Sequence, residues 1–404
     1  MKIVVQKFGG TSLQSEELRE RSGHHVLEAL REGYKVVVVV SAMGRNGAPY
    51  ATDTLLGLVG GITTPISKKE QDMLASCGET ISSVVFSTLL QQKGVKALAM
   101  SGAQAGFRTT EDYTNAKITE MKVEGLRTAL EDYDVIVVAG FQGETPKGTT
   151  ATLGRGGSDT SATSLGAALQ AEVVDIFTDV TGVMTADPRI VKNAKTISVV
   201  TYNEISNLAY QGAKVIHPRA VEVAMQAKVP IRIRSTSEDD YGTLITTSTS
   251  NVLGKDIDER PITGIAQVSN VTQIKLTAKE EEYELQSKVF KAMAKAEISV
   301  DFISIHPLGV AYTVPDHLTS LAVQVLEEMD LLPEITRNCA KVSAVGAGMT
   351  GVPGITSKIV EALANEHIQI LQSADSHTTI WVLVKETDMI NAVNALHQVF
   401  LLGN

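Results

Sequence analysis

A short glycine-containing segment near the start of the chain could bind a phosphate group. Lys7-Phe8-Gly9-Gly10-Thr11-Ser12 follows a β-branched run at residues 3–5. Glycines let the backbone come close to a ligand, so that exposed N–H groups can bind an anion. Lys7 adds a compact positive charge beside them. The spacing is not that of a P-loop, and an ordinary turn with a surface lysine explains the hexapeptide equally well.

A second glycine-rich turn lies directly before a predicted helix at residues 159–169. The turn is Gly154-Arg155-Gly156-Gly157-Ser158-Asp159. A helix N-terminus presents free N–H groups and a positive dipole end, which suit a phosphate or a carboxylate. We expect Ser158 or Asp159 to cap this helix, and Arg155 can form a bidentate pair with a carboxylate. We favour an anion site over a flexible entry loop, because an arginine between glycines has little reason to pack there.

Further charged residues follow another predicted strand. The segment at residues 178–189 offers Asp179, Asp187 and Arg189, and ligands of open α/β sheets bind beyond the carboxyl ends of strands. Its Thr-Gly and Asp-Pro pairs are equally typical of structural turns. Lys214 is a second lysine that could reach a phosphate, although such a residue is more often a solvated surface lysine.

Glu79 opens another predicted helix, in the segment Ser76-Cys77-Gly78-Glu79-Thr80. The helix dipole is a sufficient reason for an acidic residue in a first turn, so Glu79 becomes a site residue only beside a cationic ligand. Gly346–Gly351 forms a GxGxxG pattern of the dinucleotide type. Pro353 and Gly354 interrupt the helix start there, and too few residues follow for a Rossmann domain, so NAD binding is disfavoured.

Composition excludes several classes of protein. The chain has 404 residues, of which 43% are hydrophobic and 20% are charged, as in a soluble globular protein. Its formal charge of −10 shows no basic face for nucleic acid. Its apolar runs are too short to span a membrane, and its N-terminus lacks the pattern of a signal peptide. The two cysteines and eight histidines show no metal-ligand spacing. So few cysteines suit a reducing cytoplasm.

The elements that must position these residues alternate between strands and helices. Apolar, β-branched runs at residues 36–40, 135–139 and 173–177 are typical of strands buried on both faces. Helical patterns lie between such runs, for example at residues 16–30 and 76–90. This alternation predicts a mostly parallel sheet covered by helices.

The last third of the chain contains an internal repeat. SKVFKAMA at residues 287–294 matches SKIVEALA at residues 357–364, an offset of 357 − 287 = 70 residues. In each copy one predicted strand precedes the helix and two follow it. A segment rich in Ser, Thr, Asp and Gly at residues 236–255 is predicted to be a linker or a sheet edge. The two units should pack together, because each is too small to form a stable core alone.

Together, these motifs resemble those of the aspartate kinase family. The matching segments occur in the family's order and span essentially the whole chain: Lys7–Ser12, Ser41–Gly44 (SAMG), Gly154–Asp159 (GRGGSD), Asp179–Arg189 (DVTGVMTADPR) and Gly212–Pro218 (GAKVIHP). The resemblance implies an α/β amino-acid-kinase domain over residues 1–250, with a mostly parallel sheet covered by helices. Two small βαββαβ regulatory modules of the ACT type would follow, at residues 261–338 and 339–404.

The resemblance also implies roles for individual residues. It assigns to ATP the residues Lys7, Phe8, Gly9, Gly10, Thr178, Asp179, Met184, Thr185, Ala186, Asp187, Pro188, Arg189 and Lys214. It assigns to aspartate the residues Ser41, Thr52, Glu79, Arg155, Gly156, Gly157 and Ser158. Lys7, Asp159 and Lys214 form the implied catalytic group, in which Asp159 orients the phosphate-binding lysine.

The reaction implied by the resemblance transfers the γ-phosphoryl group of ATP, bound with Mg²⁺, to the β-carboxylate of L-aspartate. Both reactants are anions, so we expect lysines, backbone N–H groups and Mg²⁺ to neutralise charge and align the reacting groups. A carboxylate nucleophile is already ionised at neutral pH and needs no general base. The product, 4-phospho-L-aspartate, begins the biosynthesis of lysine and diaminopimelate, threonine and methionine, and ACT modules carry its feedback regulation.

Two other functions stay open on the sequence alone. One is a non-catalytic amino-acid sensor of the same fold, against which Lys7, Arg155, Asp159 and Lys214 argue. The other is a kinase for a different acceptor, since relatives phosphorylate glutamate, acetylglutamate, carbamate or UMP; the paired ACT modules and Glu79 favour a free amino acid. The chain is most similar to diaminopimelate-sensitive members. We therefore expect diaminopimelate as effector, with lysine or threonine as alternatives, and a cytoplasmic homodimer or higher homo-oligomer joined through the ACT modules.

Overall fold

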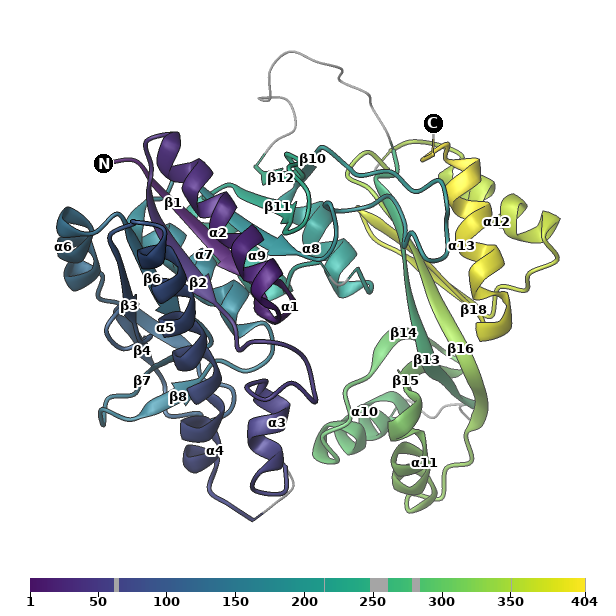
Figure 1. Ribbon diagram of the computed structural model, residues 1–404. Coiled ribbons are helices and arrows are strands. Elements are labelled where there is room, and N and C mark those ends of the chain that lie inside the picture. The colour runs from purple at the N-terminus through teal and green to yellow at the C-terminus, as the bar shows by residue number, and fades with distance from the viewer. Residues whose placement is uncertain (62–64, 214, 248–260, 278–283, 350, 404) are drawn as a thin grey trace. The chain divides into compact units, whose positions relative to one another are not determined.

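The chain folds into two compact units, which a computed structural model describes for residues 1–61, 65–213, 215–247, 261–277, 284–349 and 351–403 (Figure 1). The first unit comprises Met1–Val183, Thr196–Ala209 and Lys214–Ile257. The second comprises Met184–Lys195, Tyr210–Ala213 and Asp258–Asn404. The second unit therefore includes two short segments whose sequence neighbours belong to the first.

The first unit is built on a mostly parallel sheet with the strand order β10-β12-β11-β9-β1-β2-β6-β3. Its strands are β1 (Ile3–Phe8), β2 (Lys35–Val40), β3 (Ala97–Met100), β6 (Val135–Ala139), β9 (Val173–Thr178), β10 (Val199–Thr201), β11 (Ile231–Ser235) and β12 (Thr243–Thr246). The predicted apolar runs form β2, β6 and β9, and all are parallel to their neighbours in the sheet's centre, whereas β11 and β12 are antiparallel to each other. The predicted α/β fold is confirmed.

Helices cover both faces of this sheet (Figure 1). The helices of the first unit are α1 (Gly10–Leu13), α2 (Glu16–Arg31), α3 (Thr52–Gly57), α4 (Lys68–Ala75), α5 (Cys77–Gln92), α6 (Glu124–Asp132), α7 (Gly157–Leu169), α8 (Tyr202–Tyr210) and α9 (Pro218–Ala227). Successive side chains of a strand point to opposite faces, so Val36, Val38 and Val40 share a core with Phe86 of α5. A smaller sheet has the order β5 (Ile118–Met121), β4 (Phe107–Thr109), β7 (Gln142–Glu144) and β8 (Thr150–Thr152).

One helical stretch is long and apolar enough to cross a membrane by length and composition alone. Residues Lys68–Gln92, which contain α4 and α5, have a window of mean hydropathy 1.4, and 56% of that window is buried inside the protein. α5 packs against β3 and β6, and Phe86 and Leu90 are fully buried in the same core. The apolar residues of this stretch are thus explained by the packing of the sheet.

An ion pair crosses the central sheet between β9 and β11. Asp175 and Arg232 are directly opposite each other in the strand register, and Arg232 donates two hydrogen bonds, of 2.7 and 2.9 Å, to the Asp175 carboxylate. The Asp175 side chain is 1% exposed. We expect Asp175→Asn to lower the free energy of unfolding by about 3–5 kcal/mol, because Arg232 would lose its counter-charge. Denaturant unfolding of both proteins measures this. A loss well below about 1 kcal/mol would contradict it.

The second unit is an antiparallel sheet with the strand order β14-β15-β13-β16-β18-β17 and helices packed on it. Its elements are β13 (Gly264–Thr277), α10 (Leu285–Lys295), β14 (Asp301–His306), β15 (Gly309–Pro315), α11 (Thr319–Glu327), β16 (Glu334–Val345), α12 (Ile355–Asn365), β17 (Gln372–Asp375), β18 (Thr379–Lys385) and α13 (Met389–Val399). α10 and α12 start 355 − 285 = 70 residues apart, so the repeat seen in the sequence corresponds to two similar sets of elements.

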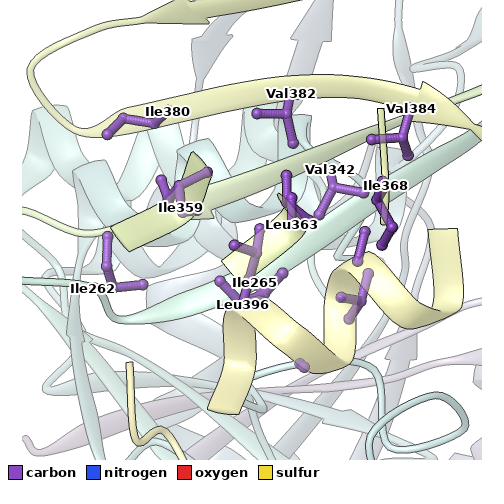
Figure 2. Close-up of a cluster of buried hydrophobic side chains, with 14 of the residues drawn as sticks. Ile262, Ile265, Val342, Ile359, Leu363, Ile368, Ile380, Val382, Val384 and Leu396 are labelled. Carbon is purple, nitrogen blue, oxygen red and sulfur yellow. The ribbon is translucent and has the colours of Figure 1, made fainter. Parts of the chain in front are cut away.

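The two longest strands, β13 and β16, serve both repeats. Asn270 and Asn338 interrupt them with left-handed backbone at φ 57° and 54°, a conformation that asparagine tolerates, and the register shifts beside them. The first half of β13 pairs with the second half of β16. Ile265, from that first half, lies in one core with Leu363 and Leu396 of the second repeat (Figure 2). The second repeat thus uses a strand that precedes the first repeat in the sequence.

Candidate active site

A cavity of about 720 Å³ in the first unit gathers residues from both glycine-rich motifs. The predicted site residues that line it are Lys7, Gly10, Ser41, Thr52, Glu79, Arg155, Gly156, Gly157, Ser158 and Asp159. They come from the ends of β1 and β2, which are parallel neighbours, and from the first turns of α1, α3, α5 and α7. The carboxyl ends of the strands and the N-termini of the helices therefore meet at this cavity, as ligand sites of α/β sheets require.

Lys7 and Asp159 form an ion pair at this cavity. Lys7 Nζ lies 2.7 Å from Asp159 Oδ1, and the two side chains are 13% and 15% exposed. Asp159 Oδ2 also accepts a hydrogen bond of 3.3 Å from the backbone N–H of His217. Strand β1 extends past the predicted run to Phe8, which places Lys7 inside the strand. Asp159 thus holds the ammonium group of Lys7 at the cavity.

The predicted cap of helix α7 was wrong. The N-cap is Gly156, in a left-handed conformation at φ 71°, with no side-chain cap, so Ser158 and Asp159 lie within the first turn. A Cβ on Gly156 would come within 2.2 Å of the His217 ring, which excludes the serine or aspartate that sequence preferences favour at a cap. The carboxylate of Asp159 pairs instead with Lys7.

The loops after β1 and β2 are in direct backbone contact. Gly44 N–H donates a hydrogen bond of 2.9 Å to Gly10 O. A Cβ on Gly10 would lie 2.6 Å from the carbonyl oxygens of both Ala42 and Gly44. Gly9 is the N-cap of α1, and the side chain of Phe8 is fully buried and stacked on Phe177. Residues 8–10 therefore present mainly backbone to a ligand.

Replacing Gly10 by alanine should move these loops apart, because backbone atoms on both sides cannot yield. We expect Gly10→Ala to lower kcat/KM for ATP by about 10²-fold, the scale of a misplacement of about 1 Å, while the protein stays folded. Steady-state kinetics and circular dichroism measure the two effects. Gly125→Ala is the matched control, because nothing lies within 4 Å of a Cβ there. A Gly10→Ala enzyme with unchanged kinetics would contradict the expected close approach.

The carboxyl group of Glu79 is buried at the wall of this cavity, and its two oxygens have different surroundings. It is 3% exposed, and its Oε1 accepts a hydrogen bond of 3.1 Å from the Ala42 N–H. Its Oε2 has no hydrogen-bond partner among the described residues. Burial raises the pKa of Glu79 to about 8, and the Ala42 N–H opposes this only in part. Such an oxygen at a cavity wall is suited to accept hydrogen bonds from a cationic ligand group.

Arg155 supplies the opposite charge at the same cavity. Its side chain is exposed, and it forms no ion pair with any residue in the described ranges. A guanidinium group without an internal partner can bind a carboxylate in bidentate fashion. With Glu79 at another part of the wall, the cavity offers a cation and a carboxyl group that can ionise, which together are complementary to an amino acid.

Thr178 and Asp179 line a neighbouring cavity of about 310 Å³ in the first unit. Thr11 and Ser12, from the first motif, line it as well. Arg45 lines both cavities and donates a hydrogen bond of 3.0 Å to Asp179. The predicted nucleotide residues at the end of β9 therefore adjoin the Lys7 motif, and Arg45 joins the two places.

The remaining predicted nucleotide residues, Met184–Arg189, belong to the second unit. Thr185 and Ala186 are buried there, Met184 is half-buried, and Pro188 and Arg189 are exposed. Arg189 donates hydrogen bonds to both carboxylate oxygens of Asp187, which lower the pKa of that carboxyl below its usual value. Lys214 lies outside the described residues.

Several residues at the site were missed in the sequence. Arg45, Asn46 and Asp53 line the 720 Å³ cavity, and their position just after the buried strand β2 is the signal that could have found them. Ligand atoms of His24, Glu28 and Asp239 lie within 4.8 Å of one another, but Arg21 pairs with Asp239. A cavity of about 830 Å³ beside Arg232 contains none of the predicted site residues.

Comparison with known proteins matches residues 2–235 to the Amino acid kinase family and residues 334–398 to the ACT domain. Aspartokinase 1 of Bacillus subtilis is 64% identical over 403 residues, which cover 100% of each chain. The crystal structure of Escherichia coli aspartokinase III with aspartate and ADP, in the R-state, has a TM-score of 0.80 at 27% identity and covers 99% of this chain and 100% of that one. The structure of the same enzyme with lysine and aspartate, in the T-state, has a TM-score of 0.76 at 27% identity, with 98% and 99% covered.

Proposed function

Since this chain belongs to the aspartokinase family, we propose that the 720 Å³ cavity of its first unit is where it transfers a phosphoryl group. The chain is an aspartate kinase, which transfers the γ-phosphoryl group of ATP to the β-carboxylate of L-aspartate. The observation that supports this location is the meeting of the Lys7–Asp159 pair with Glu79 and Arg155 in one cavity.

For aspartate, the charges of the cavity suggest an orientation. Glu79 Oε2, which has no partner among the described residues, accepts hydrogen bonds from the α-ammonium group. Arg155 pairs with a carboxylate. Hydroxyl and N–H groups at the same wall complete the site, from Ser41, Thr52, Gly156, Gly157 and Ser158. The aspartate kinase of E. coli whose structure resembles this chain was crystallised with aspartate.

We propose that the phosphates of ATP bind at the first glycine-rich motif. Lys7 and the backbone N–H groups of Phe8, Gly9 and Gly10 form a cationic cradle, and the close contact of Gly10 with the next loop fits a backbone that approaches its ligand. Thr178 and Asp179, which adjoin this cradle, are proposed to contact the nucleotide as well. The same role is proposed for Met184–Arg189 and Lys214. Mg²⁺ is brought by the phosphates, since it binds through phosphate oxygens, water and at most one or two carboxylates.

Catalysis by these residues consists of alignment and neutralisation of charge. The acceptor carboxylate is ionised at neutral pH and attacks without a general base. Lys7, held by Asp159 at 2.7 Å, keeps an ammonium group beside the γ-phosphoryl oxygens, where negative charge must be stabilised as the group passes in line between two oxygens. Mg²⁺, when bound, neutralises charge on the phosphates. Arg155 and Glu79 fix the acceptor, so that two anions meet in the required geometry.

The choice of acceptor can be tested directly. The purified protein is incubated with ATP, Mg²⁺ and hydroxylamine, which traps an acyl phosphate as a hydroxamate, and with L-aspartate, L-glutamate or no amino acid. We expect hydroxamate and an equal amount of ADP with L-aspartate, and neither with L-glutamate, because the extra methylene of L-glutamate displaces its side-chain carboxylate relative to an α-ammonium group held at Glu79. Equal hydroxamate yields from both amino acids would refute the proposed fit.

The regulatory partners belong to the same proposal. The second unit binds an amino-acid effector, diaminopimelate, with lysine or threonine as alternatives, and joins copies of the chain into a homodimer or higher homo-oligomer. A lysine complex of a related enzyme supports an amino-acid effector. We also propose that the protein works in the cytoplasm, and that its catalytic part is residues 1–250 and its regulatory modules are residues 261–338 and 339–404. Calorimetric titration of each amino acid against the full chain identifies the effector.

A further inference from the structure

The segment Met184–Lys195 carries the predicted nucleotide residues 184–189, yet it is built into the core of the second unit. Ala186 and Val191 are 3% and 1% exposed, and they belong to the same apolar cluster as Ile265, Leu363 and Leu396. Figure 2 shows these last three residues. Burial of apolar side chains is the main force that holds a segment in place. The backbone of this segment is therefore fixed by the second repeat.

Hydrogen bonds hold the segment at Thr185. Its N–H donates to Lys195 O at 2.9 Å, and its carbonyl oxygen accepts from the Ile265 N–H at 2.8 Å. Its hydroxyl oxygen accepts from the Lys195 N–H at 3.0 Å. Thr185 thus closes the segment on itself and ties it to strand β13, which belongs to the core of the second repeat.

The fourth contact of Thr185 comes from helix α13. Its Oγ1 lies 2.9 Å from Nε2 of His397, and His397 is 1% exposed. Burial lowers the pKa of His397, so the ring is neutral at pH 7 and Nε2 can accept the hydroxyl proton, since the hydroxyl oxygen already accepts from Lys195. On the same helix, Asn394 donates a hydrogen bond of 3.4 Å to Ile190 O.

We propose that Thr185 and His397 are positioning residues for the nucleotide: through their buried hydrogen bond, helix α13 sets the conformation of the segment that contacts ATP. This inference rests on the proposed nucleotide role of Met184–Arg189. Asp187, in the same segment, is also held by side-chain contacts. Its carboxylate accepts hydrogen bonds from Arg189 and, at 3.4 Å, from Gln267 of β13. The buried side chains of Thr185 and His397 therefore set the position of the exposed end of the segment, at Pro188 and Arg189.

Isosteric variants of the full-length protein test the proposal. Thr185→Val keeps the volume and removes the hydroxyl, whereas Thr185→Ser keeps the hydroxyl. Thr185→Val removes the bonds of the hydroxyl to both His397 and the Lys195 N–H. We expect it to raise the Kd for ADP, measured by calorimetry, and KM for ATP by about three- to 100-fold, the range of one to two lost hydrogen bonds. KM for L-aspartate should stay within about twofold, and Thr185→Ser should restore ADP binding.

Variants of His397 provide the second half of a double-mutant cycle. His397→Leu should weaken ADP binding as Thr185→Val does, and His397→Gln, which can still hydrogen-bond Thr185, should recover part of it. The double variant Thr185→Val/His397→Leu should bind ADP no more weakly than Thr185→Val alone, because the Thr185–His397 bond is already lost in that single variant. Gln398→Ala, at the exposed neighbour on α13, is the matched control. If His397→Leu fails to fold, the isosteric Thr185→Val decides the question.

Two results would overturn the proposal. One is an unchanged Kd for ADP in both Thr185→Val and His397→Leu. The other is a parallel loss of ATP binding, aspartate binding and melting temperature, which a merely structural role would produce. Arg189→Ala separates this inference from the proposed function, because Arg189 is exposed and lies in the same segment. If Arg189→Ala weakens ADP binding and the Thr185 and His397 variants do not, only the inference fails; if none of them does, the nucleotide role of the segment fails too.

Discussion

Replacing Lys7 by alanine is expected to lower kcat by about 10²–10³-fold, the range found when one charge-stabilising group is removed from an active site. Lys7 belongs to the first glycine-rich motif, and its ammonium group lies 2.7 Å from the Asp159 carboxylate. Without it, negative charge on the transferred phosphoryl group loses a fixed cation. The measurement is the rate of ADP release at saturating ATP and L-aspartate.

Stability and activity must be separated in this test. Lys7→Ala leaves Asp159 without its cation, so the double variant Lys7→Ala/Asp159→Ala is measured beside it; its melting temperature should lie near that of the wild type. Lys2→Ala is the matched control, because Lys2 stands just before the same strand with a side chain that is 69% exposed. A Lys7→Ala enzyme with near-normal turnover would refute the role proposed for Lys7.

Glu79→Gln is expected to raise KM for L-aspartate by about 10–150-fold, which corresponds to the loss of one hydrogen bond to a charged group. The substituted glutamine would keep the size of the side chain and the hydrogen bond with Ala42, but it would lose the negative charge that faces the α-ammonium group. KM for ATP should change little. Steady-state kinetics above about pH 8, where a group with that pKa is mostly ionised, measures both constants. An unchanged KM for L-aspartate would remove Glu79 from the site.

The same carboxyl group should shape the pH profile. Burial raises the pKa of Glu79 to about 8, so below that pH the free enzyme carries a neutral Glu79 and must lose a proton to bind an ammonium group. We expect kcat/KM for L-aspartate to rise by up to about tenfold per pH unit as the pH approaches 8. The Glu79→Gln profile should be flat over this range. Glu131→Gln, at an exposed position of α6, should keep the wild-type profile.

The pH dependence of protein stability should be opposite to that of kcat/KM for L-aspartate, because ionisation of the buried Glu79 lowers the free energy of unfolding. Because its folded-state pKa of about 8 lies above its ordinary value of 4.5, the unfolded chain releases this proton first as the pH rises. The contribution of Glu79 to stability is therefore present at low pH and falls as the pH increases from about 4.5 to about 8. Without substrate, Glu79→Gln should melt at an equal or higher temperature than the wild type at about pH 8. This outcome also shows that a loss of aspartate binding is not a loss of folding.

The framework of this protein follows from local patterns, because those patterns depend on periodicity. The apolar runs became β2, β6 and β9, and the repeated helical pattern became α10 and α12. The meeting of the glycine-rich motifs was also predictable, since parallel strands place their carboxyl ends at one edge of a sheet. General rules of sheet topology therefore sufficed to predict that Lys7 and Arg155 line one cavity.

Features that depend on long-range packing could not be predicted from the sequence. The helix cap falls at Gly156, where the ring of His217 leaves no room for a Cβ, and Asp159 pairs with Lys7. His217 and Lys7 are both distant along the chain. The hydrogen bond to one carboxylate oxygen of Glu79 comes from the backbone N–H of Ala42, 37 positions away in the sequence. Ala186 and Val191 belong to the second unit although the motif around them is continuous with β9. Nothing in the local pattern of these residues distinguishes their partners.

The contact between Thr185 and His397 joins residues that are 212 positions apart. During translation, the segment around Ala186 and Val191 leaves the ribosome long before helix α13 has been synthesised. Until α13 is made, these apolar side chains stay exposed in the nascent chain, where they can cause aggregation or bind chaperones. Contacts of such wide separation also slow folding. Under the nucleotide role proposed for this segment, a chain that stalls on the ribosome before α13 would therefore have an incomplete ATP site.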